Sequence, residues 1–359
     1  MRHTPPHADS PDPSHAPLGE ADAYPPGVTP RRLARGNAIG SALVVAGMLA
    51  LGWVLGVVAG VGVELLFDPN VWADHGLRGV APGALAGFAL GLACSCAAAC
   101  WAWFSGDRAI LRLTGAQPLR PADDPLLFRL VDELSVRAGI PRPRVYLVDD
   151  SALNSFTTGR SVWCASLGVT TGLRLALSPE ELRAVVGHEI AHIRHLDIRF
   201  GLVMATMVGL LVLACDGFLR LAVRAGPFLG RDNRDKSRTG GVLTLVFVAL
   251  AVGLSLVAPL LAWVIQLAVS REREHLADAG AVALTGDAGP MIRALRRVAA
   301  DTDPLVDRAN RATAHLFLAN PLLHMRETSQ GIDTPFSSHP CLEKRIERLA
   351  AIGPARPGE

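Results

Sequence analysis

The sequence predicts a mainly α-helical membrane protein that also carries an α+β domain with a small sheet. Half of its 359 residues are hydrophobic and only 19% are charged, which is typical of membrane proteins. Two long uncharged stretches near the N-terminus each exceed the roughly 20 residues that a helix needs to cross a bilayer. Later stretches interleave charged with apolar residues, as soluble domains do. These observations indicate a membrane anchor joined to a globular domain.

The chain begins with a polar segment that precedes the two apolar stretches. Residues 1–30 are rich in Pro, His and Ser and hold too little apolar surface to form a core, so we expect a disordered tail. Residues 31–106 are expected to form a two-helix transmembrane anchor, with spans at 37–63 and 80–106. A cleavable signal peptide is the alternative for the first span, but its apolar core would be shorter and would not follow a polar tail.

Charges and glycines around the two spans predict how the anchor is arranged. Arginines stand before the first span and after the second, which by the positive-inside bias predicts a multi-pass cell-membrane protein with both flanks in the cytoplasm. These are Arg31, Arg32, Arg35, Arg108, Arg112 and Arg120. Glycines recur at every fourth position, at Gly52, Gly56 and Gly60 and again at Gly79, Gly83, Gly87 and Gly91. Such stripes allow close backbone approach, so we expect the two helices to pack together.

Residues 107–199 are expected to form the first part of the globular domain. The pattern predicts an amphipathic helix at 124–138, closed by Gly139, and a strand at 144–148. A second strand is predicted within 161–171, a segment rich in Val and Thr. We expect it to be an edge strand beside the functional site, where an extended peptide could bind by strand addition.

Two further apolar stretches interrupt the domain. Residues 200–269 are expected to form a hydrophobic hairpin, 270–352 the second part of the domain, and 353–359 a tail. Basic residues in the loop of the hairpin would keep that loop in the cytoplasm, whereas a spanning hairpin would export it. Both a transmembrane and a membrane-dipping hairpin therefore remain open.

A His-Glu-x-x-His motif lies on a predicted helix that begins with a capping box of Ser178 and Glu181. His188 and His192 are four residues apart on one helix face, so both imidazoles can bind one Zn²⁺ ion. Glu189 then lies beside the open coordination position, an arrangement typical of zinc metalloproteases. By itself the motif also fits two surface histidines on an amphipathic helix.

A third metal ligand is expected just after the fourth apolar stretch, where the hairpin returns the chain to the membrane face it left. Glu274 is a normal third zinc ligand beside two histidines, and Asp278 one turn later could accept the free N–H of a ligating histidine. Glu272 is the competing carboxylate, but it lies on a different helix face. A charge cluster flanking a membrane helix is the alternative to a metal site.

Together these motifs resemble the HtpX family of membrane zinc metalloproteases, relatives of the CAAX prenyl proteases. The resemblance covers about 31–352 and includes two further segments, Asn154-Ser155-Phe156-Thr157-Thr158-Gly159 and Ser338-His339-Pro340-Cys341-Leu342-Glu343-Lys344-Arg345-Ile346. It implies a zincin-like α+β catalytic domain with one Zn²⁺ per chain. It further implies His188, His192 and Glu274 as the ligands and Glu189 as the catalytic base.

The resemblance also suggests that Asn154, His339 and Arg345 lie near the substrate, where a donor or cation could stabilise an oxyanion. Two positions depart from the family pattern. Ser155 stands where alanine is usual, and His275 stands where an aromatic residue is usual. Neither is a ligand position, so both departures are expected to bear on substrate fit more than on catalysis.

The expected function is a membrane-anchored zinc endopeptidase that hydrolyses peptide bonds of misfolded or membrane proteins, in membrane protein quality control as the resemblance implies. Its expected partners are protein or peptide substrates and the lipid bilayer. Scattered basic residues predict no nucleic-acid binding, and the oligomeric state remains open. The alternatives are a protease that cuts within the bilayer and a non-catalytic membrane scaffold that keeps zinc for structure.

Overall fold

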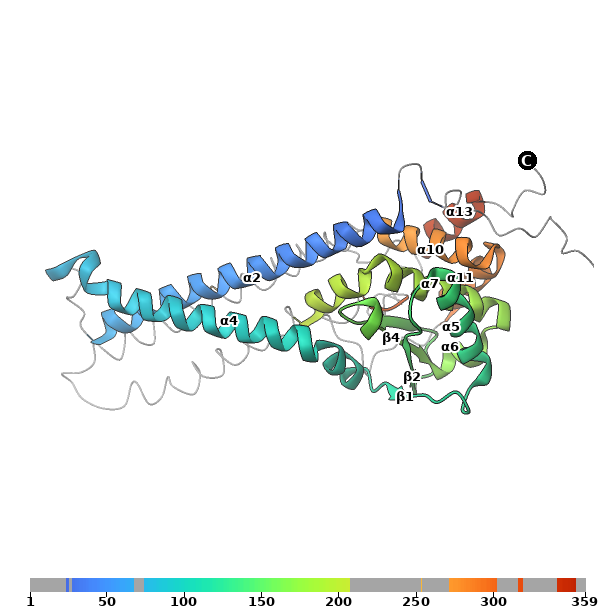
Figure 1. Cartoon of the computed structure of the whole chain (residues 1–359), viewed down its shortest axis with the longest axis horizontal. Helices are drawn as coiled ribbons and strands as arrows, with labels where there is room; N and C mark the ends of the chain where they lie inside the picture. Colours follow the sequence, from blue (N-terminus) through green and yellow to red (C-terminus); the bar gives the residue numbers. More distant parts are fainter. Residues whose placement is uncertain are drawn as a thin grey trace, which may run out of the picture.

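The structure is a computed structural model and describes residues 24–25, 28–67, 74–206, 253, 271–301, 316–318 and 341–352. Figure 1 shows two long helices that extend from a globular part, α2 (Pro30–Phe67) and α4 (Leu77–Leu113). Both are long and apolar enough to cross a membrane, over Pro30–Val61 and Leu77–Leu113. The predicted pair of apolar helices is therefore confirmed, and their crossing of a membrane stays a prediction.

The glycine stripes let α2 and α4 pack backbone against backbone. A Cβ atom added at Gly56 would lie 2.1 Å from the carbonyl oxygen of Gly87, and one added at Gly60 would lie 1.9 Å from that of Gly83. Because carbon and oxygen atoms do not approach so closely, a larger residue at these crossing points would force the helices apart. The predicted packing of the two helices is confirmed.

The globular part contains a four-stranded sheet in the order β1-β2-β4-β3. Its strands are β1 (Gln117–Pro118), β2 (Arg144–Val148), β3 (Ser155–Thr158) and β4 (Ser166–Thr170). β2 and β4 are parallel, and the two outer pairs are antiparallel. The predicted strand at 144–148 is confirmed as β2, and β4 confirms a strand within the segment predicted at 161–171.

The expectation that this second strand lies at the edge of the sheet is wrong, because β4 lies between β2 and β3. Gly159 explains the difference. It has a φ of 147°, and a Cβ atom there would lie 2.6 Å from the carbonyl oxygen of Cys164, so only glycine allows the chain to fold back here. The reversal places β3 antiparallel to β4, on the side of β4 away from β2, and β3 is therefore the edge strand.

Helices cover the sheet and enclose a hydrophobic core. α5 (Pro125–Ala138) is the helix predicted at 124–138, and it ends at Gly139 in the left-handed conformation. A short helix that was not predicted, α6 (Thr171–Ala176), leads from β4 into α7 (Pro179–His195). The second part of the domain supplies α10 (Arg271–Thr285), α11 (Gly289–Ala300) and α13 (Leu342–Ile352). Apolar faces of α5, α7, α11 and α13 meet β2 and β4 in this core.

The N-terminal segment differs from the predicted disordered tail, because Tyr24 packs on the globular part. This side chain is 5% exposed, and its hydroxyl lies 2.8 Å from His195 Nε2. One aromatic ring buries enough area to dock the chain, although the segment around it is polar. Residues 1–23 and 26–27 lie outside the described residues.

The predicted boundary between anchor and domain at residue 106 is not a break in the structure. α4 continues to Leu113, and Asp107 within it pairs with Arg144 of β2 at 3.3 Å. The anchor and the domain therefore share one continuous helix. Of the predicted hairpin, 200–206 are helical and buried, while 207–252 and 254–270 lie outside the described residues, as does the predicted tail at 353–359.

Candidate metal centre

Helix α7 carries three of the predicted site residues. Its start is fixed by the predicted capping box, which the structure confirms: Ser178 Oγ accepts from the Glu181 N–H, and Glu181 Oε2 accepts from the Ser178 N–H. At its other end Leu196 has a φ of 60°, a left-handed conformation that ends the helix. The turn at Leu196 brings Asp197 back beside His192.

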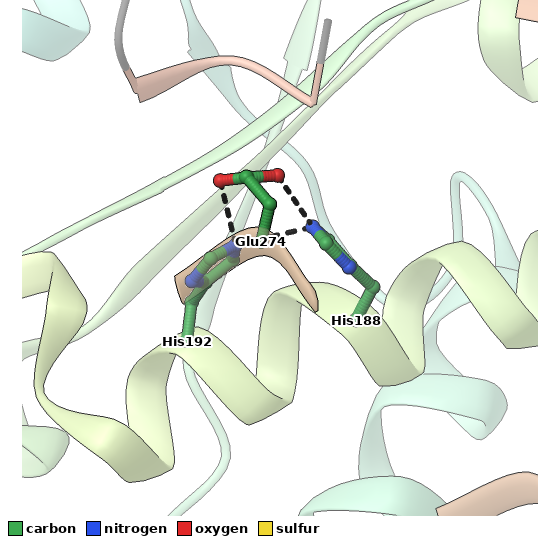
Figure 2. A group of neighbouring side chains, drawn as sticks. All are labelled: His188, His192 and Glu274. Carbon is green, nitrogen blue, oxygen red and sulfur yellow. Dashed lines mark hydrogen bonds and ion pairs between the residues drawn. The ribbon is translucent and has the colours of Figure 1, made fainter. Parts of the chain in front are cut away.

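Two imidazoles and one carboxylate point toward a common centre (Figure 2). His188 Nε2 and His192 Nε2 lie 3.1 Å apart, and the two oxygens of Glu274 each lie 3.6 Å from one of these nitrogens. Glu274 reaches the site because α10 packs closely on α7. At Gly280 of α10 an added Cβ atom would lie 2.6 Å from the Cβ of Ala191.

The spacing of these atoms fits a tetrahedral zinc ion. Ligand atoms about 2.0–2.2 Å from such an ion are roughly 3.3 Å from one another. The two nitrogens are 3.1 Å apart and each lies 3.6 Å from a different oxygen of Glu274, and with one donor atom per residue all three atoms lie within 4.8 Å of one another. Two imidazole nitrogens and a carboxylate oxygen are also donor types that zinc binds.

Each histidine is held by a carboxylate on the side away from the centre. His188 Nδ1 lies 2.9 Å from Asp278 Oδ1, and His192 Nδ1 lies 2.9 Å from Asp197 Oδ2. A carboxylate accepts the Nδ1–H of such a histidine, which leaves the lone pair of Nε2 free to bind a metal. The two bonds thus select the tautomer that a metal site needs.

Glu189 faces the edge strand β3. Ser155 Oγ donates to Glu189 Oε1 at 2.6 Å, and Thr157 Oγ1 donates to Glu189 Oε2 at 3.0 Å. The carboxylate is almost fully buried, so these two hydroxyls hold it in one orientation. Ser155, which was expected to bear on substrate fit, therefore contacts the predicted catalytic base itself.

Arg345 joins the two acidic residues of α10. Its guanidinium is fully buried and donates two hydrogen bonds to Asp278, at 2.9 and 2.7 Å. Its Nη1 lies 3.2 Å from Glu274 Oε2 and donates to the backbone oxygen of Leu318 at 2.9 Å. Burial alone would raise the pKa of Asp278, but the Arg345 charge and the bond with His188 hold that pKa well below its usual range. The same carboxylates raise the pKa of Arg345 above its ordinary value.

Negative charge also surrounds His192. Burial disfavours its charged form, but the hydrogen bond with Asp197 and the charge of Glu274 outweigh burial and raise the pKa of His192 to about 9. Burial opposes the charge of Asp197 as well, yet its bond with His192 lowers the pKa of Asp197. The centre is therefore an electronegative site that attracts a cation.

A cleft of about 40 Å³ opens beside the centre. It exceeds the roughly 10–15 Å³ that one water molecule needs, so an attacking water fits there. Segment 316–318 forms one wall and pairs with the outer edge of β3 through Phe317 and Phe156. The cleft is lined by Thr157, Glu189, His192, Asp197, Ile198, Phe200, Gly201, Arg273, Glu274, Leu316, Phe317 and Leu318.

The structure brings together most of the predicted site residues. His188, His192, Glu189, Glu274, Asp278 and Arg345 form one connected group. Asn154 is buried beside it, directly before Ser155, whose N–H its side chain accepts at 3.0 Å. His339 lies outside the described residues. Asp197 and Thr157 complete the group and were not predicted.

Residues 121–352 match the family model described as peptidase family M48. The chain belongs to peptidase family M48. Among curated relatives named "Protease HtpX homolog", that of Syntrophobacter fumaroxidans is 40% identical over 253 residues, which cover 70% of this chain and 84% of that protein. That of Acidiphilium cryptum is 41% identical over 267 residues, with coverages of 74% and 86%. That of Streptococcus equi subsp. equi is 36% identical over 246 residues, with coverages of 68% and 80%.

This M48 peptidase is accordingly a metalloendopeptidase, and the predicted resemblance to HtpX proteases is confirmed. Membership of the family implies a metal ion. Within the described part of the chain, His188, His192 and Glu274 are the group whose donor atoms converge closely enough to hold one.

Proposed function

We propose that this M48 peptidase is a membrane-anchored zinc endopeptidase that binds one Zn²⁺ per chain through His188, His192 and Glu274. The observation that carries the proposal is the convergence of their donor atoms within 4.8 Å of one another. Catalytic zinc sites commonly use three protein ligands and leave the fourth position to water. Calcium and magnesium prefer oxygen ligands, so the two imidazoles favour zinc.

Glu189 is the proposed general base. A bound zinc ion lowers the pKa of water toward neutrality and polarises the scissile carbonyl group. The Glu189 carboxylate takes the proton of the attacking water while the water oxygen bonds to the carbonyl carbon. It then gives this proton to the leaving amine as the C–N bond breaks. Ser155 and Thr157 hold the carboxylate in place for both transfers.

Residues around the ligands have separate proposed roles. Asp278 orients His188, and Arg345 holds Asp278 and Glu274 in place. Arg345 was predicted to contact the substrate, but its contacts support this holding role, because its guanidinium is fully buried against the two carboxylates. Asn154 and His339 remain the predicted contacts for the substrate or the oxyanion.

The edge strand β3 is the proposed binding place for an extended substrate. Its residue Thr157 lines the cleft, one strand position from the pairing of Phe156 with Phe317. Segment 316–318 already pairs with Ser155 and Phe156, so the proposed place for the substrate backbone is the part of the β3 edge at Thr157 and beyond. Extended binding favours unfolded polypeptide as substrate, because folded segments do not offer a free strand.

The membrane surface is proposed to lie near the end of α4 that enters the domain. Trp101, Trp103 and Phe104 are exposed there, and Arg160 and Arg199 stack over the rings of Phe104 and Trp103. Exposed aromatic residues and arginines are typical of membrane interfaces. The proposal therefore sets the catalytic domain on the cytoplasmic face of the cell membrane, where it would cut misfolded or membrane proteins in quality control.

The two alternatives have less support. A protease that cuts within the bilayer needs an apolar active-site helix, whereas α7 begins with Glu180 and Glu181 and packs against the sheet domain. A zinc-binding scaffold has no use for a buried carboxylate oriented by two hydroxyls beside the metal ligands.

Metal removal tests the proposed function. The full-length protein in detergent is treated with a chelator, dialysed, and assayed on an unfolded protein with or without added zinc. We expect cleavage to disappear with the chelator and to return with about one equivalent of Zn²⁺, whereas magnesium restores nothing. Cleavage that persists after complete metal removal would contradict the proposal.

A further inference from the structure

The anchor helix α2 reaches the metal centre through one polar side chain. Asn37 stands near the start of α2 and is 6% exposed. Its amide nitrogen donates to Asp197 Oδ1 at 2.6 Å and to the backbone oxygen of His195 at 2.9 Å. The single NH₂ group thus binds both the end of α7 and the residue that follows its turn.

Asp197 connects Asn37 to His192, a proposed metal ligand. One of its carboxylate oxygens accepts from Asn37, and the other lies 2.9 Å from His192 Nδ1. Arg273 approaches the first oxygen only to 3.8 Å, which exceeds hydrogen-bond distance. Asp197 follows the left-handed turn at Leu196, so the regular hydrogen bonds of α7 do not hold it in place.

We infer that Asn37 is a positioning residue for the metal centre, which fixes Asp197 and thereby the orientation of the His192 imidazole. The inference rests on the proposed zinc site. Partners of metal-ligating histidines change metal affinity by about 10- to 100-fold when they are removed. Asn37 does not touch His192 and acts on it through Asp197, so its loss is expected to weaken zinc binding by a smaller factor of about three to ten.

Through Asn37, the anchor helix α2 is part of the active centre. A contact that only joined α2 to the domain could use any pair of surfaces, as Gly40 and Phe200 do. Asn37 instead directs its donor at the carboxylate behind a ligand. The catalytic domain alone would therefore hold His192 less well than the full chain does.

Zinc affinity of the full-length protein in detergent tests the inference by competition with a chromophoric chelator. Asn37→Ala removes the donor, and Asn37→Asp removes it without changing the size of the side chain and sets a second carboxylate beside Asp197. Ser41→Ala is the matched control, because Ser41 is also buried on α2 but donates only to the Asn37 backbone oxygen. His192→Ala tests the proposed site itself.

We expect about three- to tenfold weaker binding for Asn37→Ala, at least about tenfold for Asn37→Asp, and a change under about twofold for Ser41→Ala. The visible spectrum of bound Co²⁺ should change in both Asn37 variants, since the imidazole moves, and stay unchanged in Ser41→Ala. Wild-type affinity and spectrum in Asn37→Asp would overturn the inference, as would equal losses in Ser41→Ala. Wild-type protein that binds no zinc, or His192→Ala that binds it normally, would overturn the proposed function instead.

Discussion

At the scale of single residues, the proposed catalytic base Glu189 is held by hydroxyl groups that come from a strand rather than from the motif helix. Ser155 and Thr157 are two positions apart on β3, so both side chains face the same side of the sheet and reach Glu189 together. Thr158 is the last residue of β3, and its side chain faces the opposite side of the sheet. It is fully buried, and its hydroxyl has no hydrogen-bond partner among the described residues. The same strand therefore supplies two hydroxyls that hold Glu189 and one buried hydroxyl that does not, which serves as a control.

Removing the hydroxyls should slow catalysis without weakening substrate binding. A hydrogen bond contributes about 0.5–1.5 kcal/mol, which is roughly a two- to tenfold effect. We expect Ser155→Ala and Thr157→Val each to lower kcat by about that factor with KM nearly unchanged. Thr158→Val should leave kcat as it is. Steady-state cleavage of an unfolded reporter measures both constants, and a loss in Thr158→Val equal to that in Thr157→Val would refute the assignment.

The proposed ligands and the supporting Asp278 could be predicted from the sequence, but the supports Asp197 and Asn37 could not. Spacing of four residues places His188 and His192 on one helix face, and Asp278 follows Glu274 at the same spacing. Asp197 is five residues beyond His192, and a continuing helix would have turned it away; only the left-handed Leu196 brings it back. Asn37 is 160 residues from Asp197, and no local pattern marks such a contact.

At the scale of elements, the two apolar helices depend on glycine where they cross. Gly56→Ala would place a Cβ atom 2.1 Å from the Gly87 carbonyl oxygen, whereas Gly47→Ala on the same helix meets nothing within 4 Å. Forced overpacking of this kind costs about 1–3 kcal/mol. We expect Gly56→Ala to destabilise the folded protein by that amount in detergent, as measured by denaturant unfolding, and Gly47→Ala to be neutral or slightly stabilising. Equal stability of the two variants would contradict the packing.

The start of α5 should be sensitive to acid. Asp124 accepts from the Leu127 N–H at the N-cap and pairs with Arg174. Burial works against the Asp124 charge, but the bonds with Arg174 and Leu127 outweigh it and lower the pKa of Asp124. A lowered folded-state pKa means that this stability is present above the unfolded-state pKa and is lost as pH falls through the folded one.

Asp124→Asn keeps a capping oxygen but loses the ion pair. We expect this variant to be less stable than wild type at pH 7 by on the order of 1 kcal/mol, with the difference shrinking as pH falls through the lowered pKa of Asp124. Denaturant unfolding at pH 7 and at a series of acidic pH values measures the difference. A stability difference between wild type and Asp124→Asn that stays constant with pH would show that the charge of Asp124 does not stabilise the fold.

Strand order was harder to predict than strand position. β2 could be located from its apolar, Val-containing sequence and β4 from the Val- and Thr-rich segment around it, but the edge depends on where the chain reverses at Gly159. α6 is six residues long, too short for a helical repeat to be recognised. Local patterns thus identify the elements, while single backbone conformations decide their neighbours.

At the scale of the whole molecule, the proposed topology has the bilayer around α2 and α4 and the domain in the cytoplasm. His75 stands exposed between the two helices, and Arg160 lies beside the exposed aromatic rings of α4. In intact cells of a background without other reactive cysteines, His75→Cys should react with a membrane-impermeant maleimide. Arg160→Cys should react only after the cells are opened. The reverse labelling pattern would show the opposite topology.

A third variant, Ser237→Cys, tests the predicted hairpin. Its labelling in intact cells would show that the loop of the hairpin is exported.

The most direct test of a catalytic zinc centre compares two substitutions in one experiment. Zinc content and cleavage of an unfolded protein are measured for wild type, Glu189→Gln and Glu274→Gln. We predict about one zinc per chain with full cleavage in wild type, the same zinc with almost no cleavage in Glu189→Gln, and loss of both in Glu274→Gln. Cleavage at the wild-type rate by Glu189→Gln, or full zinc retention by an active Glu274→Gln, would contradict the account.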